Sequence, residues 1–285
     1  MRVVVLGAGG QLGREVTEAF RRDDVIGLSR LELDICDFGY ARRVLTDLRP
    51  DVVVNAAAFT RVDQCEVEPG RAFWVNAFAV RNLAAVCAEL SAALVHVSTG
   101  YVFDGHKMTP YVEDDLPAPL SVYGVSKLAG EHFARSLAPR HLIVRTSGLY
   151  GESASGRHAN FVEKMLRLAD AGHPIRAVAD QVLTPSSATD VAAKIAELVR
   201  RECSGLYHVT NTGQCSWFEF AAEIFRLTGL TPELVPVSSD ECDARARRPR
   251  YSVLAHKRLV ESGLDDLPPW QEALARYLRA RGNLT

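Results

Sequence analysis

Short apolar, β-branched runs alternate with helical patterns along the first half of the chain. Continuously apolar runs predict strands that are covered on both faces, at residues 2–6, 25–28, 52–55, 94–98 and 141–146. Between them, an apolar period of three to four residues predicts helices at 11–21, 38–48, 71–90 and 125–136. Such alternation is typical of an α/β fold of the Rossmann type, a doubly wound parallel sheet with helices on both faces.

The alternation stops after Ser147. The stretch GESASGRHAN (151–160) is small and polar, as in a loop, and is followed by helical patterns at 161–171 and 191–201 and by the strand-like GLYHVTN. We therefore predict a core made of residues 1–147 and 187–211. Residues 148–186 and 212–285 are expected to form a smaller, discontinuous C-terminal lobe that binds the substrate.

Composition narrows the class of protein only a little. Hydrophobic residues make up 47% of the chain and charged residues 24%, with a net charge of −2, so neither nucleic acid nor an anionic membrane is expected as a partner. The six cysteines are scattered without a Cys-x-x-Cys pair, and the histidines lack metal-ligand spacing, so we expect reduced thiols and no metal site. The apolar N-terminal run is too short for a signal-peptide core. These features predict a soluble, cytoplasmic protein.

Three glycines follow the first predicted strand, in VVVLGAGGQLGREV. Gly7, Gly10 and Gly13 open the helix, where free backbone N–H groups and the helix dipole attract a dinucleotide pyrophosphate. Side chains at these positions would block that approach. The alternative is a tight strand-to-helix turn without a ligand.

The end of the second strand bears on the choice of nucleotide. A carboxylate there holds the ribose 2′-hydroxyl of NAD, whereas arginine suits the 2′-phosphate of NADP. GLSR offers Ser29 and Arg30, which favours NADP(H), while NAD(H) stays open because Glu32 reaches the same place if the strand ends later. Arg30 has an equally ordinary interpretation as a solvated surface charge.

Two further segments belong where strand ends border the cofactor. LDICD contributes Asp34 and Ile35 near the adenine, and NAAAF contributes Ala56, Ala57 and Ala58, whose small side chains let the backbone approach a flat ligand. Ordinary small-residue packing is the alternative for the alanines.

The stretch SVYGVSKLAG places Tyr123 and Lys127 four residues apart, on one helix face. Ketone reduction needs an acid to protonate the developing alkoxide, and a nearby ammonium lowers the pKa of a phenol toward the useful range. Ser98 and Thr99, at the end of a preceding strand in HVSTGYVF, offer hydroxyls for the substrate oxygen. Without the nucleotide loop, the pair would be chance neighbours on an exposed turn.

Together these motifs resemble an extended short-chain dehydrogenase/reductase. More closely, LRPDVVVNAAAFTRVDQCE, YVFDG, VYGVSKLAGE, VRTSGLYG, NFVEKMLRLA and RRPRYSVL resemble the dTDP-4-dehydrorhamnose reductase family. The resemblance runs from Met1 to about Trp270. It implies reduction of the 4-keto group of a nucleotide-activated deoxysugar with NADP(H), with the C-terminal lobe holding the sugar nucleotide.

The resemblance also implies roles for particular residues. Thr99 would bind the sugar, Tyr123 would donate the proton, and Lys127 would anchor the cofactor and tune Tyr123. Further cofactor contacts are expected at Gln11, Leu12 and Asn76, and substrate contacts at Ser98, Asn160 and Arg248. Arg248, in a basic run, would clamp the diphosphate, although a solvated loop is the commoner setting for such a run.

Two positions depart from the family pattern. Gly100 stands where the family usually has aspartate, and Gly148 where it usually has tryptophan. We expect these glycines to leave a wider and less polar sugar pocket, which suggests a bulkier or branched 4-keto sugar as an alternative substrate.

The stretches PYVEDDLPAPLSVYGVSKLAGE and RPRY also resemble the regulatory β subunit of methionine adenosyltransferase, which binds NADP and acts as a protein partner. That subunit keeps the Tyr/Lys pair, so the motif by itself leaves a non-catalytic role open. A homodimer also stays open.

Overall fold

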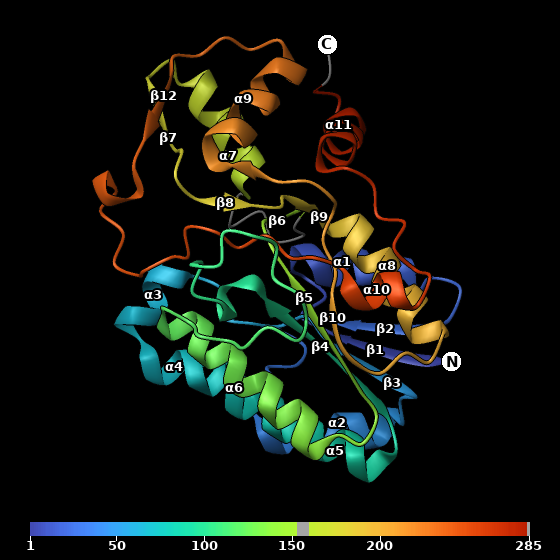
Figure 1. Cartoon of the computed structure of the whole chain (residues 1–285). Coiled ribbons are helices and arrows are strands. Elements are labelled where there is room, and N and C mark those ends of the chain that lie inside the picture. The colour runs from blue at the N-terminus through green and yellow to red at the C-terminus, as the bar shows by residue number, and fades with distance from the viewer. Residues whose placement is uncertain (153–159, 284–285) are drawn as a thin grey trace.

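The structure, a computed structural model, describes residues 1–152 and 160–283. A six-stranded parallel sheet forms the centre of its larger part (Figure 1). From one edge to the other the order is β2 (Asp24–Leu28), β1 (Arg2–Leu6), β3 (Val52–Asn55), β4 (Ala93–Thr99), β5 (His141–Thr146) and β10 (Gly205–His208). The chain thus winds one way from β1 to β2 and the other way from β3 onward. That reversal between β1 and β3 is the place where doubly wound sheets bind their ligands, and the predicted Rossmann-type fold is confirmed.

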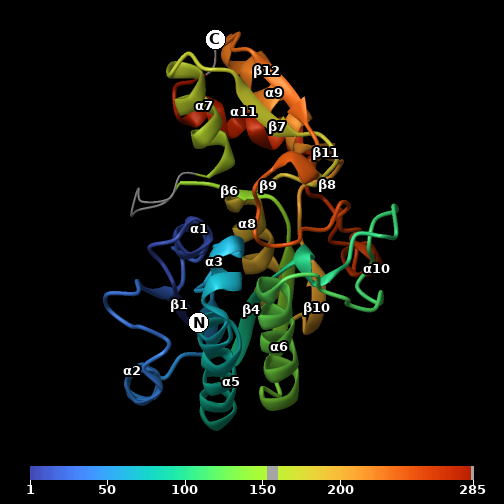
Figure 2. The same ribbon diagram turned by 90° about the vertical axis from the view of Figure 1, so that its left-hand side faces the viewer.

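Helices cover both faces of the sheet because its strands are apolar on both sides. In β1, Val3 and Val5 pack on one face against α1 (Gln11–Ala19), α8 (Ala188–Arg200) and α10 (Lys257–Glu261). Val4 and Leu6 pack on the other face, where the covering helices are α2 (Phe38–Leu48), α5 (Ala79–Leu90) and α6 (Val122–Leu137). Figure 2 shows α5 and α6 lying side by side beneath that face.

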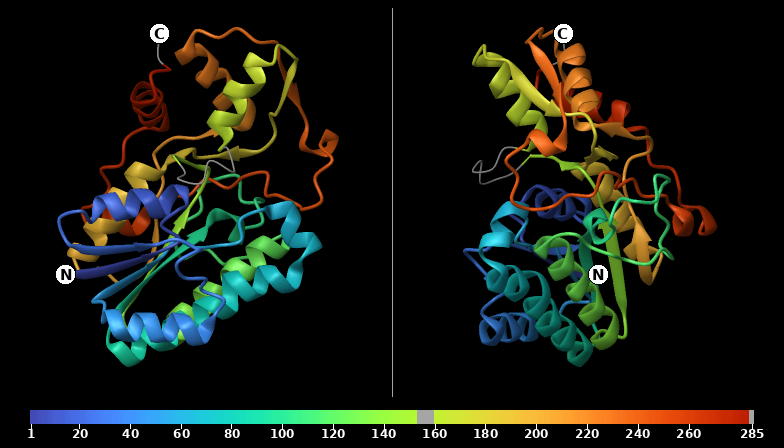
Figure 3. Two further views of the ribbon diagram at one scale, coloured as in Figure 1. Left: turned by 180° about the vertical axis from the view of Figure 1, so that it is seen from behind. Right: turned by 60° about the vertical axis from the view of Figure 1, so that its left-hand side comes forward.

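A smaller lobe sits at the carboxyl ends of the strands, as the view from behind in Figure 3 shows. Its parallel strand pair joins β7 (Ile175–Val178) and β12 (Leu234–Val237). Its helices α7 (Phe161–Asp170), α9 (Trp217–Thr228) and α11 (Trp270–Ala280) enclose an aromatic core built around Tyr150, Phe220 and Trp270. Phe220 stacks on Phe161 with ring centroids 5.3 Å apart.

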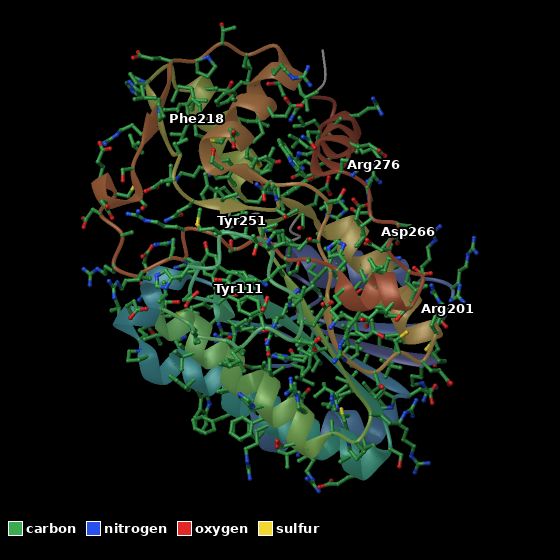
Figure 4. All side chains as sticks on the ribbon, viewed as in Figure 1. Tyr111, Arg201, Phe218, Tyr251, Asp266 and Arg276 are labelled. Atoms are coloured by element: carbon green, nitrogen blue, oxygen red, sulfur yellow. The ribbon has the colours of Figure 1, made fainter. Side chains whose placement is uncertain are left out.

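Short strand pairs connect the lobe to the core. β6 (Leu149–Tyr150) pairs with β9 (Ser186–Ser187), and β8 (Val182–Leu183) pairs with β11 (Cys215–Ser216). A separate apolar cluster closes the junction, with Tyr111 from the core side and Tyr251 from the returning chain (Figure 4). The lobe is therefore packed onto the edge where β1, β3, β4 and β5 end.

The helix predicted over residues 71–90 is more complex than its sequence pattern. It begins as α4 (Pro69–Phe73), passes through one π-helical segment, η1 (Trp74–Phe78), and continues as α5. The short helix α3 (Val62–Val67) precedes it, and two single 3₁₀ turns occur at η2 (Gly100–Val102) and η3 (Ser239–Glu241).

Two predicted boundaries change. The helix that carries Tyr123 begins at Val122, not at residue 125, because the Ser121 side chain caps it by accepting from the Gly124 N–H. The segment around α10, assigned from sequence to the lobe, packs on the core instead, since Leu259, Leu264 and Leu267 join the cluster beneath β1. None of the helices in the described part of the chain has the length and hydropathy needed to cross a bilayer.

Candidate active site

The glycine loop forms a close-fitting cradle between β1 and α1. Gly7 has φ +80°, and a Cβ there would lie 2.8 Å from the Ala57 backbone nitrogen. A Cβ at Gly13 would lie 2.1 Å from the Gly7 carbonyl oxygen. Gly10 occupies the N-cap of α1 and provides no capping side chain, so the first N–H groups of the helix are left for an anion.

Gln11 and Leu12, both predicted to contact the cofactor, lie in different surroundings: the Gln11 side chain has a polar atom left unpaired among the described residues, and the Leu12 side chain packs in the apolar core. The Gln11 carbonyl oxygen Oε1 is buried with no hydrogen-bond partner in the described protein, as expected for a group that a ligand satisfies. Leu12 is buried beneath the sheet. Beside the cradle, Ala56 donates its N–H to the Leu6 carbonyl at 3.0 Å, which holds the alanine segment at the end of β3.

The tip of β2 presents one arginine and one carboxylate to solvent. The Arg30 side chain is 71% exposed and donates from Nε to Asp34 at 3.1 Å. Glu32 accepts from the Ser29 N–H at 2.7 Å, and this bond lowers the pKa of its carboxyl. The Ile35 side chain is buried in the apolar cluster that packs against the α2, α5 and α6 side of the sheet.

Asn76 lies in the π-helical segment and joins two parts of the site. Its carbonyl accepts from the Phe59 N–H at 2.8 Å, and its amide donates to the Phe59 carbonyl at 3.1 Å and to Ser126 Oγ at 3.0 Å. Ser126 in turn donates to the Tyr123 carbonyl at 2.8 Å. A π-helical segment at such a place is common in functional sites. All polar atoms of Asn76 are thus used within the protein, and it positions the loop after β3 and the first turn of α6.

Tyr123 and Thr99 lie next to each other at the carboxyl end of β4, and Lys127 lies one turn further along α6. The Thr99 hydroxyl is a polar neighbour of the Tyr123 hydroxyl, and Thr99 Oγ1 accepts from the Tyr101 N–H at 3.1 Å. Lys127 is buried and donates from Nζ to the Val97 carbonyl at 2.6 Å. The three residues expected to carry the chemistry are therefore neighbours on α6 and the end of β4.

Lys127 does not lower the pKa of Tyr123, contrary to the expectation from the spacing of the two residues. Burial raises the pKa of Tyr123, and the interaction with the Thr99 hydroxyl opposes that rise. Burial lowers the pKa of Lys127 to about 8, against the attraction of Glu131. Thr99, rather than Lys127, is the group that lowers the Tyr123 pKa here, because the ammonium is directed to the Val97 carbonyl.

The predicted substrate residues lie in different settings. Ser98 donates to the Glu131 carboxylate at 2.5 Å. Asn160 caps α7 and donates to the Gly151 carbonyl at 2.8 Å. Because both side chains are engaged within the fold, a substrate contact for either stays a prediction.

Arg248 does lie near Tyr123, with Tyr101 between them. Its guanidinium lies close to the Tyr101 hydroxyl and forms two hydrogen bonds with Asp63. The Tyr101 ring stands edge-on to Tyr123 at 6.2 Å. Sequence reasoning missed Tyr101 and Asp63, although YVFDG and RVDQCE, which contain them, were among the motifs that carried the family resemblance.

The structure leaves no open space at the two departures from the family pattern. Gly148 has φ +54°, and a Cβ there would lie 2.7 Å from Leu183 Cδ1 and 2.8 Å from the Thr184 carbonyl oxygen. A Cβ at Gly100 would lie 3.2 Å from the Ser252 carbonyl oxygen. Chain segments from the lobe junction thus lie close to both glycines, and the wider sugar pocket stays a prediction.

Taken together, a glycine cradle at the β1–β3 reversal and a Tyr-x-x-x-Lys face beside a strand-end threonine define a Rossmann-fold reductase of the short-chain dehydrogenase class. The family model described as "RmlD substrate binding domain" matches residues 1–282, and the chain belongs to that family.

Named relatives agree with this assignment. The spore coat polysaccharide biosynthesis protein SpsK of Bacillus subtilis is 39% identical, over 99% of this chain and 98% of its own. A dTDP-4-keto-6-deoxy-D-glucose reductase of Streptomyces niveus is 40% identical, over 96% of each chain. A crystal structure of the Bacillus anthracis dTDP-4-dehydrorhamnose reductase with NADP is 39% identical, with a TM-score of 0.94 over 98% of this chain and 99% of that one.

Proposed function

We propose that this protein reduces the 4-keto group of a nucleotide-activated deoxysugar with NADPH, converting dTDP-4-dehydro-L-rhamnose to dTDP-L-rhamnose. The observation that carries the proposal is the placement of the Tyr123 hydroxyl beside Thr99 at the end of β4, one turn from the buried Lys127. Family membership and the activities named for the relatives support it. A nucleotide sugar is its expected partner, and a cytoplasmic location and a homodimer are further expectations.

The residues present fit NADP(H). The glycine cradle and the α1 N-terminus suit the pyrophosphate, and the unpartnered Gln11 carbonyl lies at the first position of that helix. The exposed Arg30 suits a 2′-phosphate. Thr146 and Ser147, at the end of β5, have buried hydroxyls without partners in the described protein, as expected beside a polar ligand. When bound, the cofactor supplies the hydride.

Tyr123 supplies the proton. Its raised pKa keeps the phenol protonated at neutral pH, so the Oη proton is available to the oxygen that gains charge at the sugar C4. Thr99 orients the Tyr123 hydroxyl and offers a second polar contact for the same oxygen. Lys127, one helical turn away, bonds through its ammonium to the Val97 carbonyl and is assigned to holding the cofactor and not to lowering the Tyr123 pKa.

The substrate is tested by following the loss of NADPH absorbance with a panel of nucleotide sugars. We expect dTDP-4-dehydro-L-rhamnose to be reduced with the highest kcat/KM. Faster turnover of a branched or bulkier 4-keto sugar would support the alternative substrate.

The non-catalytic alternative makes a different prediction. A regulatory subunit like that of methionine adenosyltransferase would bind NADPH and turn over none of these sugars. The Streptomyces niveus relative and the Bacillus anthracis structure are both named as reductases, which favours the enzyme.

A further inference from the structure

A third titratable side chain, Glu131, lies on the face of α6 that carries Tyr123 and Lys127. Glu131 follows Lys127 by four residues and Tyr123 by eight, so the three share one helix face. Its carboxylate is 1% exposed. It accepts from Ser98 Oγ at 2.5 Å and from Arg145 Nε and Nη2 at 2.9 and 2.7 Å. These three bonds tie α6 to the adjacent strands β4 and β5.

Arg145 is itself buried, at 2% exposure, with its guanidinium 5.1 Å from the centre of the Phe103 ring. A buried ion pair of this kind is seldom worth more to stability than apolar residues of similar volume. Stability alone therefore does not explain the buried Arg145–Glu131 ion pair.

The surroundings of Lys127 indicate that role. Its ammonium donates to the Val97 carbonyl of β4, next in sequence to the serine that bonds Glu131. The groups facing it are Glu131 and Tyr123 from α6, and His96 from β4. His96 is fully buried, and its pKa lies well below the usual value, so it is neutral near pH 7. Glu131 is thus the group that counters the loss of hydration at Lys127.

We propose that Glu131 is a positioning residue of the reductase site: fixed by Arg145 and Ser98, it holds α6 against β4 and β5 and places a negative charge one helical turn from Lys127. The role in catalysis rests on the proposed function. The charge relationship between Glu131 and Lys127 does not, and can be measured without substrate.

The chain is favourable for a direct titration because it has five lysines: Lys107, Lys127, Lys164, Lys194 and Lys257. With ¹³C-labelled lysine, the Cε signals of the full-length protein can be followed by NMR against pH. Lys127 is expected to titrate near pH 8. Lys194 and Lys257, whose pKa values are raised by carboxylate partners, serve as internal references.

We expect Glu131→Gln to lower the Lys127 midpoint by ~1 pH unit, the size of effect that one nearby opposite charge produces. Glu113→Gln is the matched control, because Glu113 is also buried but bonds to the backbone of His208 and Arg258. It should leave the Lys127 midpoint unchanged. In NADPH oxidation, the alkaline limb of the pH profile should move with the Lys127 midpoint.

If Glu131→Gln does not fold because Arg145 is left unpaired, the double variant Glu131→Gln/Arg145→Met removes the charge without an orphaned partner. The same direction of shift is expected. An unchanged Lys127 midpoint in a folded variant would overturn the proposal, whether or not the protein reduces a keto sugar. Failure of every sugar in the assay would count against the proposed function alone.

Discussion

Asp63, in α3 of the core, accepts two hydrogen bonds from the guanidinium of Arg248, on the chain returning from the lobe. Nη2 lies 2.6 Å and Nη1 3.1 Å from the two carboxylate oxygens. The Ala246 N–H adds a third bond to Asp63 at 3.0 Å. Because Arg248 also lies close to Tyr101, which stands edge-on to Tyr123, this pair links the lobe to the proposed proton donor.

We expect Arg248→Lys to raise the KM for the nucleotide sugar by ~10-fold, since an ammonium cannot make the paired bonds of a guanidinium to a carboxylate or diphosphate. The dissociation constant for NADPH should stay the same. The matched control is Arg250→Lys, two residues further along the chain, which disturbs only an exposed ion pair with Asp240. It should leave both the KM and the NADPH dissociation constant near wild type. Equal KM values for the two variants would show that Arg248 has no special place in substrate binding.

Gly148 should tolerate substitution poorly for two separable reasons. Alanine there adopts a positive φ, at a cost of ~1–2 kcal/mol, and also forces its Cβ against Leu183 and Thr184, at a further ~1–3 kcal/mol. Gly172→Ala isolates the first cost, because Gly172 has φ +72° and nothing within 4 Å of the added Cβ. Urea unfolding should therefore show a larger loss for Gly148→Ala. Equal losses of unfolding free energy in the two variants would mean that contacts with Leu183 and Thr184 do not restrict the side chain at position 148.

The buried His208 should make the fold sensitive to mild acid. Burial lowers its pKa to about 3, while its Nδ1–H bonds to the Tyr111 and Ala255 carbonyls at 3.1 and 3.0 Å. Between the unfolded pKa, about 6.5, and that value, the unfolded chain takes up a proton that the folded one does not. The free energy of unfolding should then fall as pH falls, by up to ~1.4 kcal/mol per pH unit.

Urea unfolding between pH 7 and 5 measures this slope, before most carboxylates titrate. His208→Asn should flatten the slope, and His106→Asn, at an exposed position, should not. A slope that His208→Asn leaves unaltered would assign the acid sensitivity to other groups, of which the buried His96 is the first to examine.

The elements of the core could be predicted because burial on both faces makes the strands continuously apolar. The ends of β1, β3 and β5 match the predicted ranges. The π-helical segment that aims Asn76 inward could not be predicted, since its five residues hardly disturb the apolar period of the long helix around it. The two-residue strands of the lobe junction are equally invisible, because they are too short to show a period.

The same distinction holds for the site. Tyr123, Lys127 and Thr99 could be predicted because each has a residue type and spacing that ketone reduction requires. Asp63 and Arg248 are 185 residues apart in sequence, and only the fold shows that they pair. The direction of Lys127, toward Val97, likewise depends on how α6 sits on β4.

The central claim is that the Tyr123 hydroxyl is the acid in a keto-sugar reduction. The direct measurement is the loss of NADPH absorbance with dTDP-4-dehydro-L-rhamnose for wild type, Tyr123→Phe and Tyr251→Phe, with NADPH affinity determined separately. Tyr251 is the control, because its hydroxyl donates to Gln214. We predict that Tyr123→Phe lowers kcat by ~10²–10⁴-fold with NADPH still bound, and that Tyr251→Phe stays near wild type. Full activity in Tyr123→Phe, or NADPH binding without turnover in the wild type, would contradict it.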